Sequence, residues 1–417
     1  MALSNTDVVG LQLIKTRDKL PLLFERGSMF LDKMMKRPAE KVSSLSMRVP
    51  LKVQPGGNVG SFDPNGGDMG RGSGTLINYA TVTPVWVKTA IEITSQADWA
   101  TDSKEKAIEN AVKMNIADAM PQFRTDLDCY MQTAGNGVMG TVSSVSGSTI
   151  TLSDTPFGAR LFREQMTVQV YDSTLATNRG SMAITQVNKE LGATQSIVVD
   201  AVPGGTTGTD VIVVGGVSGA SPTWFFGIPY FHNTSSSGTN LGLSRSLFYM
   251  RANGVDVSSS AISVGAGQLA VDQIRQALGD DSMGKLFWHT HPAQQAAIQN
   301  LKLQVTQYIK QSGNGRDDVD LAFNLEAPFC GIKVMSNIHA DVTRMDAINL
   351  ETWGKAETKA LDYFEIDGQR VFEIRGASGG VAAAMIFYLC WGAQTFVDNC
   401  RAITSITSLS TPVGYTT

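Results

Sequence analysis

The stretch VPLKVQPGGNVGSFDPNGGDMGRGSGTLINYATVTPVWVKTAIEIT, Val49 to Thr94, has two runs of alternating apolar and polar residues on either side of a glycine-rich segment. Eight glycines fall within the nineteen residues from Gly56 to Gly74. Alternation with a period of two is typical of β-strands, and clustered glycine marks turns and loops. The stretch therefore predicts an extended β-hairpin whose two strands are joined by a long, glycine-rich tip.

Two chemical interpretations of this tip are weaker than the structural one. A phosphate-binding loop would require GxxxxGK[ST], or GxGxxG at the start of a helix, and neither occurs here. The segment DPNGGD, Asp63 to Asp68, resembles part of a calcium loop but lacks the distal glutamate of an EF-hand. A turn within the hairpin tip is the better interpretation of both patterns.

Helices are predicted on both sides of the hairpin. Residues 7–37 carry apolar side chains at helical spacing with a proline between them, which indicates one or two short helices in an N-terminal arm. After the hairpin, Asp102 and Glu105 resemble a capping box, and a long helix is expected over residues 102–133, with a bend just before Pro121. The apolar stripe of this helix consists of Ile108, Val112, Ile116, Ala119, Phe123, Leu127 and Tyr130.

The composition then changes. Residues 138–217 contain short strand patterns separated by turn residues and flanked by glycine-rich joints, which predicts a small inserted β-barrel or sandwich. Beyond it we predict a helix at 266–279, a strand at KLFWHTH and a helix from Pro292 to about Lys310. Further strands are predicted at FCGIKVMSN, DAINLETW, LDYFEI, QRVFEIR and AAMIFYLCW.

The bulk composition limits the range of functions. Hydrophobic residues make up 42% and charged residues 17%, which suits an ordered globular chain. The net charge is −4 without a long run of Lys or Arg, whereas a dedicated DNA reader usually carries a basic stripe. The four cysteines form no CxxC pair, which indicates reduced, buried thiols. We expect no signal peptide, and the longest apolar run, Val381 to Ala393, is too short to span a membrane.

His289 and His291 are the strongest candidates for a metal site. In a strand both imidazoles would point to the same face as Phe287, and two imidazoles at that spacing could hold zinc. A catalytic zinc needs a third protein ligand, and no partner motif is recognisable. The candidates for this third ligand are His232, His339 and Cys330. Because Pro292 suits the first turn of a helix, we predict a structural strand-to-helix turn, with no metal and no cofactor.

The segment GASGG, Gly376 to Gly380, matches the G-x-S-x-G pattern of hydrolase nucleophiles. In that architecture the triad histidine follows the serine, but every histidine of this chain precedes Ser378. A glycine-rich hairpin loop is therefore predicted here, and we expect no catalytic residue.

The order of the predicted elements resembles that of the major capsid proteins of tailed phages, which have the Hong Kong 97-type coat fold. Four stretches are similar to segments of that family: its Gly-x-x-Arg segment, the strand and helix of its central domain, the strand that follows them, and its near-terminal strand. In this chain they read GLSRSLFYMRAN, KLFWHTHPAQQAAIQNLK, APFCGIKVMSN and AAMIFYLCWGAQTF. The individual matches are loose, whereas their order is specific and covers most of the chain.

The resemblance implies an α+β chain with a Hong Kong 97-like capsid fold and an inserted small all-β domain. The implied segments are an N-terminal arm (1–50), an extended hairpin loop (51–92), a peripheral domain with a spine helix (93–137), the inserted domain (138–217), a return of the peripheral domain (218–258) and an axial or central domain with return strands (259–417). The implied function is that of a non-enzymatic shell subunit. Its copies would form hexamers and pentamers of an icosahedral head around double-stranded DNA, located in the virion and assembled in the bacterial cytoplasm without contact to a membrane.

The resemblance also implies partners and contacts. Only about 50 residues precede the hairpin, so a separate scaffolding protein is expected, together with a portal protein and decoration proteins. A covalent cross-link from the tip is not expected, because no lysine lies between Lys52 and Lys88. The tip has few sizeable apolar side chains and a single cation, and these are the expected contacts with a neighbouring subunit. They are Val59, Phe62, Met69 and Arg71.

Two alternatives remain open at this point. Within the same fold, the chain would be the shell of an encapsulin-type protein compartment. From another class, it would be a metal-dependent hydrolase that uses His289 and His291.

Overall fold

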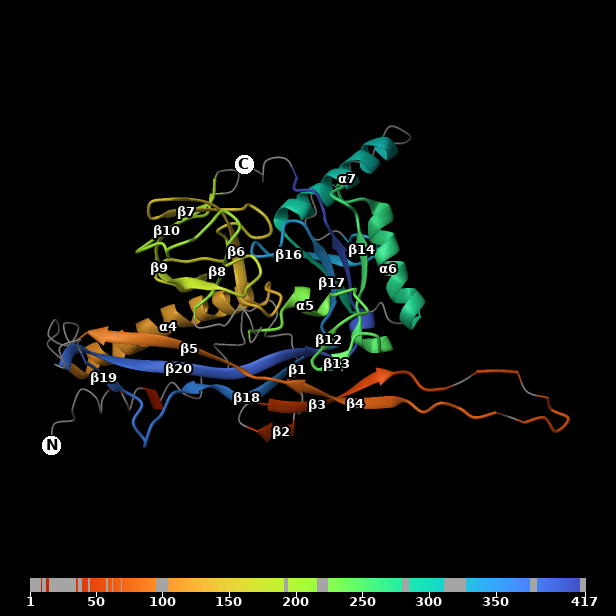
Figure 1. Cartoon of the computed structure of the whole chain (residues 1–417), viewed down its shortest axis with the longest axis horizontal. Helices are drawn as coiled ribbons and strands as arrows, with labels where there is room; N and C mark the ends of the chain where they lie inside the picture. Colours follow the sequence, from red (N-terminus) through yellow and green to blue (C-terminus); the bar gives the residue numbers. More distant parts are fainter. Residues whose placement is uncertain are drawn as a thin grey trace.

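The computed structural model describes residues 9, 13–14, 35–36, 40–43, 46–57, 59–61, 63–68, 70–94, 104–190, 194–215, 224–279, 285–310, 328–375 and 381–412. Most of the predicted N-terminal helices, the capping residue Asp102 and the loop around Ser378 lie outside these ranges. In the described part, the chain is a mixed α/β structure in which strands outnumber helices (Figure 1).

A long sheet and the helix packed on it form one side of the molecule. The sheet has the order β1-β18-β20-β19, and β5 also pairs with β20. Its strands are β1 (Met35–Lys36), β5 (Val85–Thr94), β18 (Trp353–Tyr363), β19 (Phe372–Arg375) and β20 (Val381–Val397). Helix α4 (Lys104–Tyr130) lies along β5 and continues through Pro121. The side chains of the predicted stripe that the structure describes are buried or half-buried, because this face of α4 forms part of the core.

The strands between Val138 and Val214 form a closed barrel in the order β10-β7-β6-β11-β8-β9. The strands are β6 (Val138–Ser146), β7 (Thr149–Leu152), β8 (Thr167–Tyr171), β9 (Asn178–Asn188), β10 (Ser196–Val199) and β11 (Val211–Val214). The barrel interior is filled by aliphatic side chains such as Ile150, Val168 and Ile212. These residues belong to the same apolar cluster as Ile116 and Phe123 of α4, so helix and barrel share one core.

A second sheet has the order β14-β21-β17-β15-β16 and mixes parallel and antiparallel pairs. Its strands are β14 (Asn253–Asp256), β15 (Leu286–Thr290), β16 (Lys333–Ser336), β17 (Met345–Asn349) and β21 (Thr404–Thr407). Helix α6 (Val264–Leu278) begins at Ser263, whose side chain accepts a hydrogen bond from the N–H of Ala266. Helix α7 (Pro292–Lys310) begins directly after β15, as the sequence predicted.

Strand β3 (Ser46–Gln54) pairs antiparallel with β4 (Leu76–Val82), which confirms the predicted hairpin. Strand β2 (Glu40–Ser43) pairs with β3 at the base. The remaining short elements lie beside this base: α5 (Ile228–Phe231), β12 (Thr239–Asn240), β13 (Leu243–Ser244), η1 (Phe248–Met250) and η3 (Cys400–Ala402). No helix in the described ranges is long and apolar enough to cross a membrane.

Two predicted strand boundaries were wrong. DAINLETW is not one strand, because β17 ends at Asn349 and a turn precedes β18 at Trp353. LDYFEI is not a separate strand either, because its first residues complete β18, which ends at Tyr363. The turn follows from Asn349, whose side chain accepts a hydrogen bond from the N–H of Glu351, a local contact that competes with a continuing strand.

Candidate assembly surface

The base of the hairpin is anchored in the body of the protein by one of its faces. Alternate residues of β3 are buried, and with Ala80 and Val82 of β4 they join an apolar cluster that also contains Phe231 and Trp353. The buried β3 residues are Met47, Val49, Leu51 and Val53. Because the side chains of a strand alternate between its faces, this anchoring turns the intervening residues toward solvent.

The solvent-facing side of the hairpin carries exposed apolar groups. Ile77 is 63% exposed and Tyr79 is 56% exposed. In the register of the two strands, Lys52 lies opposite Ile77 and Pro50 lies opposite Tyr79. Large apolar side chains that project side by side into solvent typically mark a contact surface. This outward face was missed at the sequence level, because both faces of β4 contain apolar residues.

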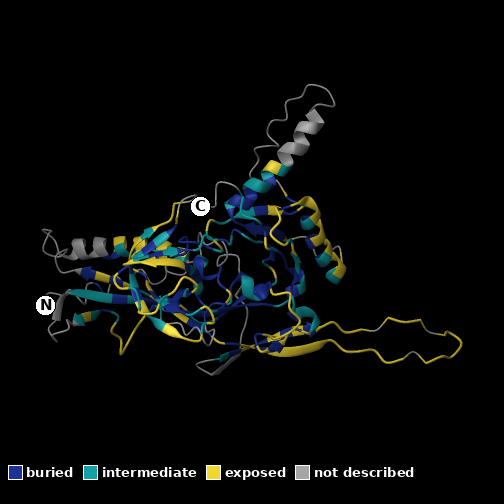
Figure 2. Cartoon of the chain, turned by 45° about the horizontal axis from the view of Figure 1, so that its top comes forward, coloured by how far each residue is buried: buried dark blue, intermediate teal, exposed yellow. Residues whose placement is uncertain are grey.

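The tip of the hairpin extends away from the rest of the molecule (Figure 1) and its described residues are exposed (Figure 2). It is held by contacts within itself. The N–H of Gly57 donates to the carbonyl oxygen of Ser73 over 2.7 Å, and the N–H of Gly67 donates to the carbonyl oxygen of Asp63 over 3.2 Å. The positive φ of Gly57, Gly66 and Gly70 explains why glycine is needed at these bends.

The predicted contact residues lie in this tip where the structure describes them. Val59 is fully exposed, and Arg71 is exposed without an ion pair to any described residue. Phe62 and Met69 lie outside the described residues. The described residues therefore place a valine and an unpaired cation far from the subunit's own core.

A second apolar surface lies on the long sheet, at the end that is remote from the hairpin. A groove with a volume of about 570 Å³ is formed by side chains of the segment between β18 and β19 and of strands β5, β19 and β20. Its apolar lining consists of Phe364, Ile366, Phe372, Ile374, Ile386 and Tyr388, and its carboxylates are Glu92 and Glu373. Figure 1 shows β19 and the hairpin tip at opposite ends of the elongated molecule. Exposed contact groups at two different ends suit head-to-tail association between copies.

The two histidines singled out from the sequence have different surroundings. His289 lies in β15 opposite Asp346 of β17, and the charges nearest to it are those of Asp346, His232 and Arg344. Burial lowers the pKa of His289 to about 4, so the imidazole is neutral near pH 7. The neighbouring Asp346 carboxylate accepts hydrogen bonds from Arg344, which holds the pKa of this carboxyl below its usual range despite burial.

His291 lies beyond the end of β15, in the turn that starts α7. Its Nδ1 accepts a hydrogen bond from the N–H of Ala293 over 3.1 Å, as expected for a strand-to-helix turn. Burial lowers the pKa of His291 to about 3, and the nearby Arg160 guanidinium acts in the same direction. Among the described residues, no three His, Cys, Asp or Glu side chains are grouped so that they could hold a metal ion. The arrangement therefore favours packing and hydrogen bonding at the strand-to-helix turn.

Comparison with known proteins identifies the fold. No protein-family model and no curated protein sequence matches the chain. The chain is similar to the subunit of the cyanophage A-1(L) capsid at 14% identity, with 94% of this chain and 93% of that chain covered and a TM-score of 0.51. It is also similar to the capsid of the native GTA particle (10% identity, 92% and 91% covered, TM-score 0.47) and to a virus-like particle from Pyrococcus furiosus (9% identity, 94% and 98% covered, TM-score 0.36). The chain shares its fold with the cyanophage capsid subunit over nearly its whole length.

Proposed function

We propose that the chain is the major capsid protein of a tailed phage, a structural subunit whose copies assemble into an icosahedral head around double-stranded DNA. The single observation that carries the proposal is the fold shared with a phage capsid subunit over nearly the full length of both chains. Fold alone does not specify function, so the projecting hairpin supplies the second argument. Its exposed apolar side chains and unpaired Arg71 have no partner within the described part of the subunit.

In this proposal, the elements of the structure take the roles of the parts of a Hong Kong 97-type coat protein. The hairpin of β3 and β4 takes the place of the extended loop, and α4 takes the place of the spine helix. The long sheet with α4 forms the peripheral domain, and the second sheet with α6 and α7 forms the central domain. The barrel within residues 138–217 is the inserted domain. We keep the segment boundaries predicted from the sequence as part of this proposal.

In the proposed shell, the hairpin of one copy lies across the surface of the next. A contact between two different surfaces is heterologous and closes into rings when the rotation between copies permits, as in hexamers and pentamers. Burial of Ile77, Tyr79 and Val59 against a neighbour would contribute about 1.5–3 kcal/mol for each large side chain that becomes fully buried. Phe62 and Met69 add to the same contact, and Arg71 pairs with a carboxylate of the neighbour.

The proposed role is mechanical rather than enzymatic. The DNA is held without sequence readout, which suits a chain of net charge −4 that lacks a long basic run. A separate scaffolding protein, a portal protein and decoration proteins are the expected partners. The mature protein is located in the virion after assembly in the bacterial cytoplasm.

The proposal is tested by expressing the full-length chain, alone and together with the genes that flank it, and examining the product by sedimentation and electron microscopy. We expect closed shells of uniform diameter, which contain DNA when formed during infection. Failure to form shells under both conditions, with a folded subunit, would rule out this function. Shells that contain a protein cargo and no DNA would instead identify an encapsulin-type compartment.

A further inference from the structure

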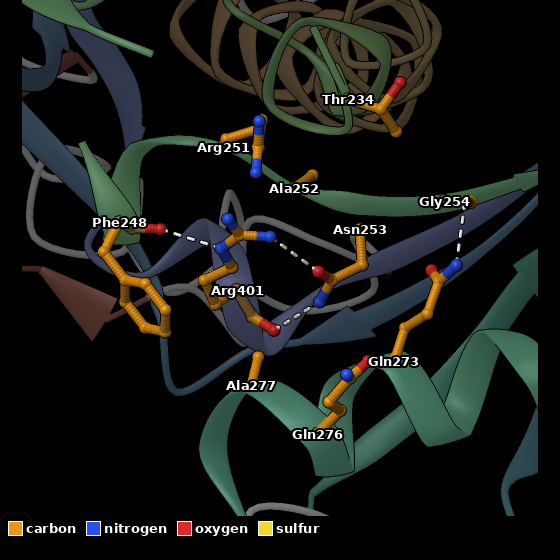
Figure 3. Close-up of a pocket in the computed structure, with 10 residues that line it drawn as sticks. All are labelled: Thr234, Phe248, Arg251, Ala252, Asn253, Gly254, Gln273, Gln276, Ala277 and Arg401. Carbon is orange, nitrogen blue, oxygen red and sulfur yellow. Dashed lines mark hydrogen bonds between the residues drawn. The ribbon is translucent and has the colours of Figure 1, made fainter. Parts of the chain in front are cut away.

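A polar cavity lies at the junction of β14, α6, η1 and η3 (Figure 3). Its volume is about 420 Å³, within the range of small-molecule sites. Its lining residues are Thr234, Phe248, Arg251, Ala252, Asn253, Gly254, Gln273, Gln276, Ala277 and Arg401. Two of these are arginines and none is an aspartate or glutamate, so the lining has two positive charges without a negative one.

Arg401 is held in a defined position in this cavity. Its Nε donates to the carbonyl oxygen of Phe248 over 2.8 Å, and its Nη1 donates to Oδ1 of Asn253 over 3.0 Å. Nδ2 of Asn253 donates in return to the carbonyl oxygen of Arg401 over 2.9 Å. The guanidinium also lies 5.1 Å from the centroid of the Phe248 ring. These contacts leave Nη2 available as a donor within the described part of the chain, and they fix the direction in which it points.

Arg251 brings a second guanidinium to the same cavity, and Figure 3 shows the two groups next to each other. Arg251 forms no ion pair or hydrogen bond with any described residue, although it is half-buried. Burial and the charge of Arg251 both lower the pKa of Arg401, which indicates that the two cations are close enough to repel each other. Two adjacent like charges are unfavourable unless an anion lies between them.

Neutral donors complete the set of groups around the cavity. The side-chain amide of Gln276 on α6 and the hydroxyl of Thr234 make no hydrogen bond to a described residue. The side-chain amide of Gln273 is already engaged within the cavity lining, because its Nε2 donates to the carbonyl oxygen of Gly254 over 3.2 Å. The cavity thus offers two charged and two neutral donor groups that come from separate elements of the chain.

We propose that this cavity, with Arg251 and Arg401 as its principal ligands, binds a phosphate group. Arginine is the preferred partner of phosphate because its planar fork can donate two parallel hydrogen bonds. Arg251 has this fork available, and Nη2 of Arg401 adds a further charged donor. A phosphate monoester carries a charge of about −1.5 to −2 near pH 7 and so matches two guanidiniums, whereas a carboxylate neutralises only one. The cavity also has room for the group attached to the phosphate. The phosphate therefore comes either from a free ion or mononucleotide, or from nucleic acid, where each phosphodiester carries one charge and two consecutive groups would balance both guanidiniums.

The test uses the full-length protein and inorganic phosphate as the probe. Phosphate binding is followed by ³¹P NMR and by the rise of the melting temperature with phosphate concentration, against sodium acetate at equal ionic strength. We expect saturable binding of phosphate and a much weaker effect of acetate. Arg251→Gln should weaken phosphate binding by roughly tenfold or more, because one charge-assisted contact is lost. The side chain of Arg251 makes no hydrogen bond or ion pair with a described residue, so we expect this variant to remain folded.

The matched control is Arg275→Gln, which removes an exposed arginine of α6 that faces Asp272 rather than the cavity. It should bind phosphate like the wild type. Equal weakening by both variants, or equal binding of acetate and phosphate, would overturn the proposal. The second outcome would show that the two arginines do not distinguish phosphate from a carboxylate.

A second arm distinguishes the two sources of phosphate. A short single-stranded DNA oligonucleotide is titrated at fixed salt into wild type and Arg251→Gln. Weaker binding by the variant, and competition by free phosphate, would identify nucleic acid as the source. Unchanged oligonucleotide binding with weakened phosphate binding would identify a free ion or mononucleotide. Neither result depends on shell formation, so this inference and the proposed function fail separately.

Discussion

Nδ1 of His232 lies 3.1 Å from Oδ1 of Asp346, and both side chains are buried. His232 caps the C-terminal end of α5, and Asp346 lies in β17, so the contact joins the base of the hairpin region to the centre of the second sheet. Arg344 completes the group, since its Nε and Nη2 both donate to the Asp346 carboxylate. The guanidinium of Arg344 thereby compensates the negative charge of Asp346, which burial would otherwise disfavour.

Replacing this carboxylate should strongly destabilise the subunit. In Asp346→Asn, Arg344 remains buried without its counter-ion, and we expect the free energy of unfolding to fall by about 3–5 kcal/mol in urea denaturation. The control is Asp272→Asn, which removes the exposed partner of Arg275 and should leave stability nearly unchanged. Similar stability of the two variants would contradict a structural role for the buried pair.

The stability of the subunit should decrease in mild acid. Burial lowers the pKa of His289 from 6.5 to about 4, so between these pH values the unfolded chain binds a proton that the folded chain does not. The free energy of unfolding therefore falls as the pH falls through this range, by about 3 kcal/mol for His289 when each pKa unit corresponds to about 1.4 kcal/mol. His289→Gln should show a smaller loss of stability between pH 7 and pH 4.5, measured by urea denaturation. An identical pH dependence in wild type and variant would exclude His289 as its source.

The outward face of the hairpin should matter for assembly and not for folding. Ile77→Ser and Tyr79→Ser should reduce the yield of shells while leaving the melting temperature of the dissociated subunit unchanged, because these side chains are already exposed in the subunit. The contrasting variant is Leu51→Ala on the buried face, which should cost the subunit about 2–5 kcal/mol. Normal shell yield and stability in both outward variants would show that this face is not an interface.

The tip cation should act between copies. Arg71→Ala should weaken assembled shells, measured as dissociation in urea, with no change in the stability of the isolated subunit. Arg71→Lys should restore part of this stability, because the charge is retained while the bidentate geometry is lost. Phe62→Ala is expected to behave like Arg71→Ala. Equal protease resistance of residues 55–75 in subunits and shells would argue against a contact of the tip with a neighbour.

The elements with strong local signals could be predicted from the sequence. The β3–β4 hairpin follows from alternation and clustered glycine, and α7 follows from Pro292 directly after an apolar strand. The closure of the barrel was harder to predict from the sequence, because the pairing of β10 with both β7 and β9 depends on contacts between distant segments. For the same reason nothing in the sequence indicated that Arg251 and Arg401 line one cavity, since neither residue belongs to a local motif.

The shared core of the barrel and α4 has a practical consequence for the insertion of foreign peptides. A foreign peptide cannot replace the whole barrel, because removing the barrel would expose the apolar side chains of α4 that pack against it. The turn at Gly147 is a better insertion point, since it is exposed between β6 and β7 and, apart from its two chain neighbours, no described residue has an atom within 4 Å of the position of a Cβ. A guest sequence placed there would extend from a rigid support, which should give every copy the same presentation.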